Sequence, residues 1–306
     1  MKRVLITGAN GFIGKNLYWR LNQFGRPKKI LVEKGCSNQK WNNREKNNLK
    51  WNNQDETLEI LSYDIDNAWE ELCDFINRAD FIFHLAGINR SKRNEDFETG
   101  NKCFTEKLVN ILENTGKNTP LLISSSIQAV QDNPYGVSKK GAEEAVFEYG
   151  RRTGARVCVY RLPNVFGKWS RPHYNSVVAT WCYNISRNLP IQINNPDTEI
   201  ELVYIDHVID EFINALNGYE NRGEDGFCHI FQTFKTSLNE LADILYSFKQ
   251  SRATLVVPNL QGDFQRFLYA QYLSYLPEND FGYNLQMRHD NRGWLAEFIK
   301  SKQFGQ

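Results

Sequence analysis

The sequence of 306 residues has no long apolar run, and none of its stretches approaches the length of a membrane span. Its first apolar run is too short for a secretory signal and leads directly into a glycine-rich turn. It also has no excess of one charge, since 37 Lys and Arg residues accompany 36 Asp and Glu residues. We therefore expect neither a membrane nor a nucleic acid as a partner.

The sequence also lacks the closely spaced cysteine or histidine pairs that are typical of metal sites and disulfide frameworks. The six cysteines are scattered along the chain, and none forms a Cys-x-x-Cys pair. His173 and His207 have no paired metal-ligand spacing either. We expect reduced thiols, no metal site and a cytoplasmic location.

What the sequence does contain is a regular alternation of short apolar runs with helical patterns. The runs lie at residues 4–6, 29–32, 58–61, 81–85, 121–123 and 157–160. This alternation predicts an α/β fold with a doubly wound parallel sheet of the Rossmann type. After residue 167 the alternation becomes irregular, with helical patterns at 175–187, 207–216 and 238–248. The length of the chain allows one large domain and a smaller lobe.

The most informative motif is a glycine turn close to the N-terminus. Gly8, Gly11 and Gly14 separate the apolar run at 4–6 from an amphipathic stretch at 17–24. Glycine lets the chain turn sharply, lets backbone N–H groups approach a pyrophosphate and lets the helix pack close to the strand. The anion would then lie at the helix N-terminus. A strand, a glycine turn and a helix in succession predict a dinucleotide site.

A second motif combines Tyr135 and Lys139, four residues apart at the start of a helical pattern. This spacing places both side chains on one helix face. We expect the ammonium group to lower the pKa of the tyrosine, which can then exchange a proton with a carbonyl or alcohol oxygen. Residues 124–126 are serines that follow an apolar run, at the strand end where open α/β sheets bind ligands.

With these motifs, the chain resembles the extended short-chain dehydrogenase/reductase family, also described as the NAD-dependent epimerase/dehydratase family. Residues 84–87 (His-Leu-Ala-Gly), 161–167 and 203–208 fall in family order. Residues 124–136, 166–169 and 174–180 are more similar still to the capsular-polysaccharide reductases of UDP-N-acetyl-L-fucosamine synthesis. Those enzymes join a reductase domain to a C-terminal cupin domain. The resemblance covers most of the chain.

The resemblance implies roles for particular residues. Tyr135 would be the catalytic acid, Lys139 would support it, and Ser126 or Ser125 would orient the substrate oxygen. The expected cofactor-binding residues are Gly8, Asn10, Gly11, Phe12, Ile13, Gly14, Glu33, Lys34, Asp64, Ile65, Leu85, Ala86, Gly87, Tyr135, Lys139, Leu162 and Pro163. The expected substrate-binding residues are Asn164, Lys168, Trp169, Arg171 and Asn175.

Several of these positions have a second interpretation. Glu33 would hold the ribose hydroxyls of NADH, whereas Lys34 would attract the 2′-phosphate of NADPH, and we favour NADPH slightly. Asp64 would contact the adenine amino group, or residues 64–67 would only cap a helix. Asn101 would order the active-site helix, or be a plain surface residue. The pair at 143–144 is interpreted as a solvated helix face.

The expected domains are a dinucleotide-binding domain at 1–167, to which a helix at 206–217 returns, and a substrate lobe at 168–205 and 218–285. Residues 286–306 resemble the start of a cupin domain, with a final strand and turn of the lobe as the alternative. Residues 35–56 are expected to form a long surface loop.

The predicted activity is NADPH-dependent reduction of the C4 ketone of a UDP-linked 2-acetamido-2,6-dideoxy-hexulose in capsule or O-antigen synthesis, by a homodimer with a cupin epimerase domain or partner. One alternative is a 4-epimerase or dehydratase that retains its NAD. Family dehydratases need an Asp-Glu pair after the catalytic hydroxyl residue, where this chain has Ile127 and Gln128. The other alternative is a non-catalytic dinucleotide sensor, but such proteins commonly lose the Tyr/Lys pair.

Overall fold

The computed structural model describes residues 1–24 and 57–301. The chain divides into two compact units. Unit 1 comprises residues 1–162 and 207–230, and unit 2 comprises residues 163–206 and 231–306. The expected strand at 29–32 and the expected loop at 35–56 lie outside the described residues.

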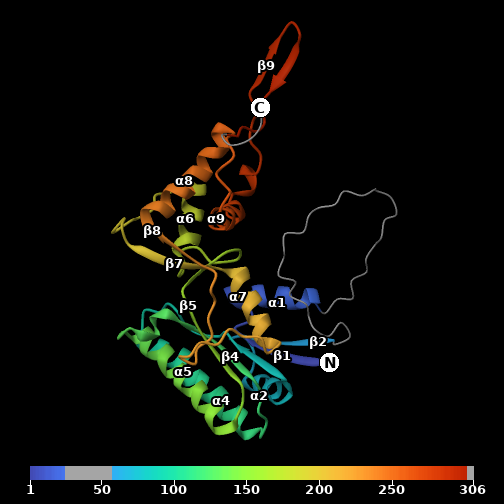
Figure 1. The fold of residues 1–306 in the computed structure, drawn as a ribbon, viewed down its shortest axis with the longest axis vertical. Helices are drawn as coiled ribbons and strands as arrows, with labels where there is room; N and C mark the ends of the chain where they lie inside the picture. Colours follow the sequence, from blue (N-terminus) through green and yellow to red (C-terminus); the bar gives the residue numbers. More distant parts are fainter. Residues whose placement is uncertain (25–56, 302–306) are drawn as a thin grey trace, which may run out of the picture. The chain divides into compact units, whose positions relative to one another are not determined.

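Within the part of unit 1 that the structure describes, residues 1–24, 57–162 and 207–230, five strands form one sheet and all pair in parallel (Figure 1). The order across the sheet is β2-β1-β3-β4-β5. The strands are β1 (Lys2–Thr7), β2 (Leu58–Tyr63), β3 (Phe81–His84), β4 (Leu121–Ser126) and β5 (Val157–Leu162). The order reverses next to β1, which is the arrangement of a doubly wound fold. The predicted fold class is therefore confirmed.

Helices cover both faces of this sheet because successive strand residues point to opposite sides. Leu5 and Val159 belong to a core that they share with α2 (Trp69–Arg78), α4 (Phe104–Asn114) and α5 (Pro134–Thr153). On the other face lie α1 (Phe12–Phe24) and α7 (Ile205–Leu216) (Figure 1). There the rings of Phe83 and Tyr160 lie 6.1 and 5.2 Å from the ring of Phe212 on α7.

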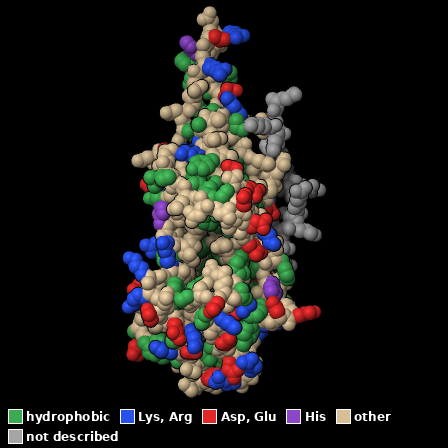
Figure 2. Space-filling view, turned by 90° about the vertical axis from the view of Figure 1, so that its left-hand side faces the viewer, with side chains coloured by type: hydrophobic (Ala, Val, Ile, Leu, Met, Phe, Trp, Pro, Cys, Tyr) green, Lys and Arg blue, Asp and Glu red, His purple; other side chains and the backbone are tan. Residues whose placement is uncertain are grey.

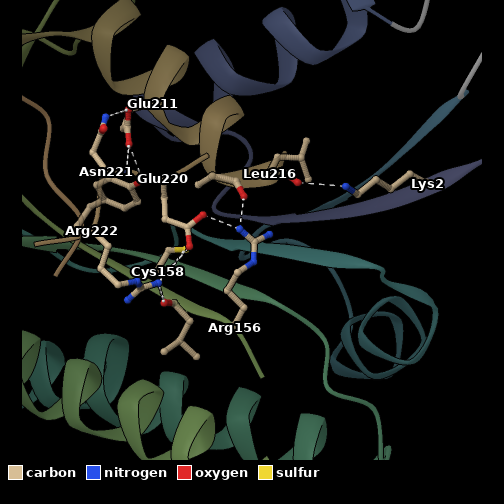
Figure 3. Close-up of polar contacts among 11 residues, drawn as sticks. Lys2, Arg156, Cys158, Glu211, Leu216, Glu220, Asn221 and Arg222 are labelled. Atoms are coloured by element: carbon tan, nitrogen blue, oxygen red, sulfur yellow. Dashed lines mark hydrogen bonds and ion pairs between the residues drawn. The ribbon is translucent and has the colours of Figure 1, made fainter. Parts of the chain in front are cut away.

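Residues 218–230 group with unit 1, whereas the sequence placed them in the substrate lobe. The reason is a set of buried and half-buried polar contacts to the sheet and to α7 (Figure 3). The guanidinium of Arg156 binds the carboxylate of Glu220 at 2.7 Å, and the amide of Asn221 donates to Glu211 at 2.9 Å. The backbone N–H of Cys228 donates to the Val159 carbonyl at the edge of the sheet.

Unit 2 contains a small mixed sheet with the strand order β6-β7-β8. Strand β6 (Asn164–Phe166) is parallel to β7 (Glu199–Tyr204), and β7 is antiparallel to β8 (Thr233–Ser237). Three helices, α6 (Val177–Ser186), α8 (Leu238–Thr254) and α9 (Asp263–Ser274), pack against one another. These elements confirm a smaller α+β lobe. The sequence patterns predicted α6 and α8 but not α9.

Residues 287–296 form an antiparallel hairpin of β9 (Met287–Asp290) and β10 (Gly293–Ala296) (Figure 1). Gly293 has a φ of 145°, which only glycine adopts without strain, and Arg292 pairs with Asp290 in the turn. The side chains of this hairpin are largely exposed. A short 3-10 turn, η3 (Glu278–Asp280), precedes the hairpin.

The surface carries a mixture of charges. Figure 2 shows Lys and Arg side chains interspersed with Asp and Glu side chains on one face of the molecule. Some of them form ion pairs one helical turn apart, such as Arg152 with Glu148. Among residues 1–24 and 57–301, no helix is both long and apolar enough to span a bilayer.

Candidate active site

The glycine turn joins β1 to α1, and its glycines are required by close backbone approach. Gly8 has a φ of 70°, and a Cβ there would lie 2.7 Å from the backbone nitrogen of Ala86. A Cβ on Gly14 would lie 2.2 Å from the Gly8 carbonyl oxygen. The first N–H groups of α1, which begins at Phe12, have no acceptor within the helix and are free to bind an anion. The turn therefore fits a dinucleotide pyrophosphate.

Two further segments expected to hold the cofactor lie beside this turn. The backbone N–H of Leu85 donates to the Thr7 carbonyl, which places residues 85–87 next to Gly8. The carboxylate of Asp64 accepts the backbone N–H of Asn10 at 2.7 Å. Residues 8–14, 64 and 85–87 thus converge at the carboxyl ends of β1, β2 and β3, while Ile65 beside Asp64 is exposed.

The alternative role of residues 64–67, as the N-cap of a helix, is wrong because the N-cap lies one residue later. Helix α2 begins at Trp69 with Ala68 as its N-cap, and the carboxylate of Glu71 accepts the Ala68 N–H at 3.0 Å. The Asn67 side chain instead accepts the N–H of Asp64 at 2.8 Å and closes the turn before the helix.

Tyr135 lies in the first turn of α5 and forms a hydrogen bond with Ser126 at the end of β4. The side chain of Asn133 caps the helix by accepting the Gly136 N–H at 2.8 Å. Burial raises the pKa of Tyr135, and the hydrogen bond with Ser126 lowers it by less. The pKa of Tyr135 is therefore raised overall, whereas the sequence predicted that it would be lowered. The phenol is protonated at neutral pH and is a proton donor.

Lys139 is buried one turn along α5 and donates from Nζ to the Ser124 carbonyl at 2.7 Å. Burial lowers the pKa of Lys139 to about 8, and Glu143 opposes this shift. A Cβ added to Gly87 would lie 3.8 Å from Lys139 Nζ. The ammonium group therefore lies beside the cofactor-side segment 85–87.

Asn101 is buried in a short π-helix, η1 (Glu98–Cys103), which follows α3 (Asn94–Phe97). Its side chain accepts the Ile88 N–H at 2.8 Å and donates to the Ile88 carbonyl and to Ser138 Oγ, at 2.9 and 3.0 Å. The alternative of a plain surface asparagine is therefore wrong. Asn101 joins the segment after β3 to the helix that carries Tyr135 and Lys139, and π-bulges are frequent at functional sites.

The structure separates the two candidate serines. Ser126 Oγ contacts Tyr135, whereas Ser125 is buried and its hydroxyl donates to Glu143. Glu143 is 2% exposed, so its assignment to a solvated helix face is wrong. It forms a two-point ion pair with Arg161 of β5, at 2.9 and 2.6 Å. Sequence reasoning missed Glu143, although its position four residues after Lys139 was visible.

The expected substrate-binding residues lie within one stretch of unit 2. Asn164 opens β6 and donates to the Glu201 carbonyl at 3.2 Å, and Lys168 Nζ lies 3.2 Å from the Asp206 carboxylate. Trp169 is half exposed and has a φ of 67°. Arg171 lies over the Tyr174 ring, and Asn175 is exposed shortly before α6.

Four expected cofactor residues remain. Leu162 is buried at the end of β5, beside Ser126 in the sheet register. Pro163 follows it and opens unit 2. Glu33 and Lys34 lie outside the described residues, so the structure has no bearing on them.

Comparison with known proteins gives three kinds of match. The model of the NAD dependent epimerase/dehydratase family matches residues 4–227. The chain is 40% identical over 304 residues to the UDP-2-acetamido-2,6-beta-L-arabino-hexul-4-ose reductase of Pseudomonas aeruginosa, covering 99% of this chain and 73% of that protein. The capsular polysaccharide assembling protein CapF from Staphylococcus aureus is similar in structure, with a TM-score of 0.81 and 39% identity over 99% of this chain and 73% of that chain.

A more distant structural match is the UDP-glucuronic acid 4-epimerase from Bacillus cereus, solved with UDP-glucuronic acid and NAD. Its TM-score is 0.64 at 17% identity, with 89% of this chain and 98% of that chain covered. At this level of identity the similarity concerns the fold alone.

Proposed function

Since the chain belongs to the NAD dependent epimerase/dehydratase family, we propose that it reduces the C4 ketone of a UDP-linked 2-acetamido-2,6-dideoxy-hexulose. The observation that carries the proposal is the grouping of Ser126, Tyr135 and Lys139. The protonated tyrosine is hydrogen-bonded to Ser126, and Lys139 donates to the carbonyl of Ser124 on the same strand. The choice of substrate is supported by the 40% identity to a reductase of such a sugar.

In the proposed reaction, a bound reduced nicotinamide supplies a hydride to the keto carbon. Ser126 and Tyr135 hold the keto oxygen by hydrogen bonds, and the phenolic proton of Tyr135 moves to that oxygen as the C=O bond becomes C–OH. The raised pKa of Tyr135 suits this direction, because the tyrosine must begin as a proton donor. The ammonium of Lys139 stabilises the phenolate until solvent returns a proton.

The glycine turn and residues 85–87 would hold the cofactor, with Asp64 toward the adenine and Lys139 toward the nicotinamide ribose. We propose NADPH as the preferred cofactor, on the basis of Lys34 and the family resemblance. The expected result is a lower Kd for NADPH than for NADH, measured by fluorescence titration of each. Tighter binding of NADH would assign the ribose to Glu33 instead.

The proposed setting is capsule or O-antigen sugar synthesis in the cytoplasm, by a homodimer that works with a cupin epimerase domain or partner. The support is the sequence similarity of residues 286–306 to the start of such a domain and the likeness to a capsular polysaccharide assembling protein. In unit 2, Lys168 and Arg171 are the cations proposed to hold the UDP diphosphate.

The test is to mix the purified protein with NADPH and a UDP-4-keto-6-deoxy-N-acetylhexosamine and to follow the absorbance of the reduced nicotinamide. We expect net consumption of the cofactor, and far slower consumption with Tyr135→Phe. Conversion of the sugar without net consumption would contradict the proposal and indicate an epimerase that retains its NAD.

A further inference from the structure

Glu143 is a buried carboxylate one helical turn beyond Lys139, and its neighbour Glu144 is exposed. The two glutamates are adjacent in sequence, yet only one of them points into unit 1. A buried charge is costly unless it is paired and hydrogen-bonded, so its surroundings indicate what it does.

The contacts of Glu143 satisfy the whole carboxylate. Oε1 accepts from the Ser125 hydroxyl and from Arg161 Nε, and Oε2 accepts from the terminal nitrogen of Arg161 at 2.6 Å. An ionised carboxylate is purely an acceptor, and three donors converge on this one. The Arg161 guanidinium in turn lies 4.0 Å over the Phe227 ring. The Glu143 side chain is therefore held in place from two strands, by a guanidinium and a hydroxyl.

Several groups from different elements face Lys139. Glu143 comes from its own helix, on which Tyr135 precedes Lys139 by one turn, and Asn101 comes from the π-helix. His84 of β3 is close enough that Lys139 lowers its pKa, but burial already keeps that imidazole neutral. Arg161 of β5 lies beyond the carboxylate.

We propose that Glu143 is a positioning residue that keeps Lys139 protonated and fixes the end of β4, so that Ser126 faces Tyr135. The carboxylate reaches β5 through Arg161 and β4 through Ser125, which follows directly on Ser124, the residue whose carbonyl accepts from Lys139 Nζ. The effect on turnover rests on the proposed reduction, whereas the effect on Lys139 does not.

The pKa of Lys139 supports the same conclusion. Burial lowers the pKa of Lys139 to about 8, a value that already includes the opposing effect of Glu143. Without the carboxylate, only burial would act on the pKa of Lys139 and would lower it further. A large share of Lys139 would then be neutral at pH 7.5. A neutral amine does not stabilise the phenolate that forms when Tyr135 gives up its proton.

The experiment compares Glu143→Gln with Glu144→Gln, which makes the same chemical change at the exposed neighbour. The protein is labelled with [ε-13C]lysine and titrated by NMR, and Lys139→Met identifies the resonance. Lys139 should titrate well below ordinary lysines. We expect Glu143→Gln to lower its pKa by roughly one unit, within the range for a nearby opposite charge, and Glu144→Gln to leave it unchanged.

Removing Glu143 alone leaves Arg161 with an unpaired charge, and that variant can fail to fold. The double variant Glu143→Gln/Arg161→Met removes both charges together, and we expect the pKa of Lys139 to fall there as well. A wild-type titration in either folded variant, or an equal shift in Glu144→Gln, would overturn the proposal.

The pH dependence of kcat is a second test of the proposal. In Glu143→Gln the alkaline limb of the kcat profile should move to lower pH together with the Lys139 titration, which a merely structural loss would not cause. If the wild type consumes no NADPH with the keto sugar, the proposed function fails, and the lysine titration still decides the role of Glu143.

Discussion

The buried histidine of unit 1 gives a prediction of stability with a magnitude. His84 is 1% exposed, and burial, followed by the charge of Lys139, lowers its pKa from 6.5 to about 3. Its ring lies between Thr7 Oγ1, at 2.8 Å from Nδ1, and Thr105 Oγ1, at 2.9 Å from Nε2. Because the Thr105 hydroxyl donates to the Asn101 carbonyl, it must accept from Nε2–H. Nδ1 therefore accepts from Thr7, and protonation would break that bond.

Proton linkage determines whether the folded state gains or loses stability as the pH falls. Between pH 6.5 and 3 the unfolded chain binds a proton at this histidine and the folded chain does not, so stability is lost as pH falls. Each pH unit in this window costs about 1.4 kcal/mol, and the loss between pH 8 and pH 5 is roughly 2 kcal/mol from His84 alone.

The assay is urea unfolding at pH 8 and pH 5 for the wild type, for His84→Gln and for His289→Gln. Glutamine keeps one donor and one acceptor but does not titrate, and His289 is an exposed histidine of the hairpin. We expect the wild type and His289→Gln to lose about 2 kcal/mol more than His84→Gln between the two pH values. Equal losses in all three proteins would refute the assignment of a neutral buried His84.

Three further predictions concern turnover. Tyr135→Phe should retain NADPH binding by titration and lose kcat by about 10²–10⁴-fold, and wild-type turnover would remove Tyr135 from the mechanism. Ser126→Ala should lower kcat by about 10²-fold and Ser125→Ala by much less, because only Ser126 bonds to Tyr135; the reverse order in steady-state kinetics would contradict this. Lys168→Ala should raise KM more than it lowers kcat, as loss of uniform binding does, and unchanged UDP affinity would place the diphosphate elsewhere.

Local motifs made much of unit 1 predictable. The glycine turn, the alternating apolar runs and the Tyr/Lys spacing depend on residues close in sequence, and they predicted the parallel sheet and the helix that begins at Pro134. Helix α7 was also predicted within two residues of its observed start at Ile205.

The predictions that were wrong concern features that depend on contacts between residues distant in sequence. Glu143 and Glu144 have the same local pattern, and Glu143 is buried because Arg161 and Ser125 supply donors from two strands. The direction of the Tyr135 pKa shift was wrong because burial is a property of the assembled fold, whereas the lysine spacing is local. Residues 218–230 were misplaced for the same reason, since their partners are on β5 and α7.

The most direct test of the central claim follows the hydride itself. The protein is incubated with NADPH deuterated at nicotinamide C4, on the transferred face, and with the UDP-linked 4-keto sugar, and the product is examined by NMR and mass spectrometry. The account predicts one deuterium at C4 of a 4-hydroxy sugar for each NADPH consumed. A product without deuterium at C4, or with an unreduced ketone, would contradict it.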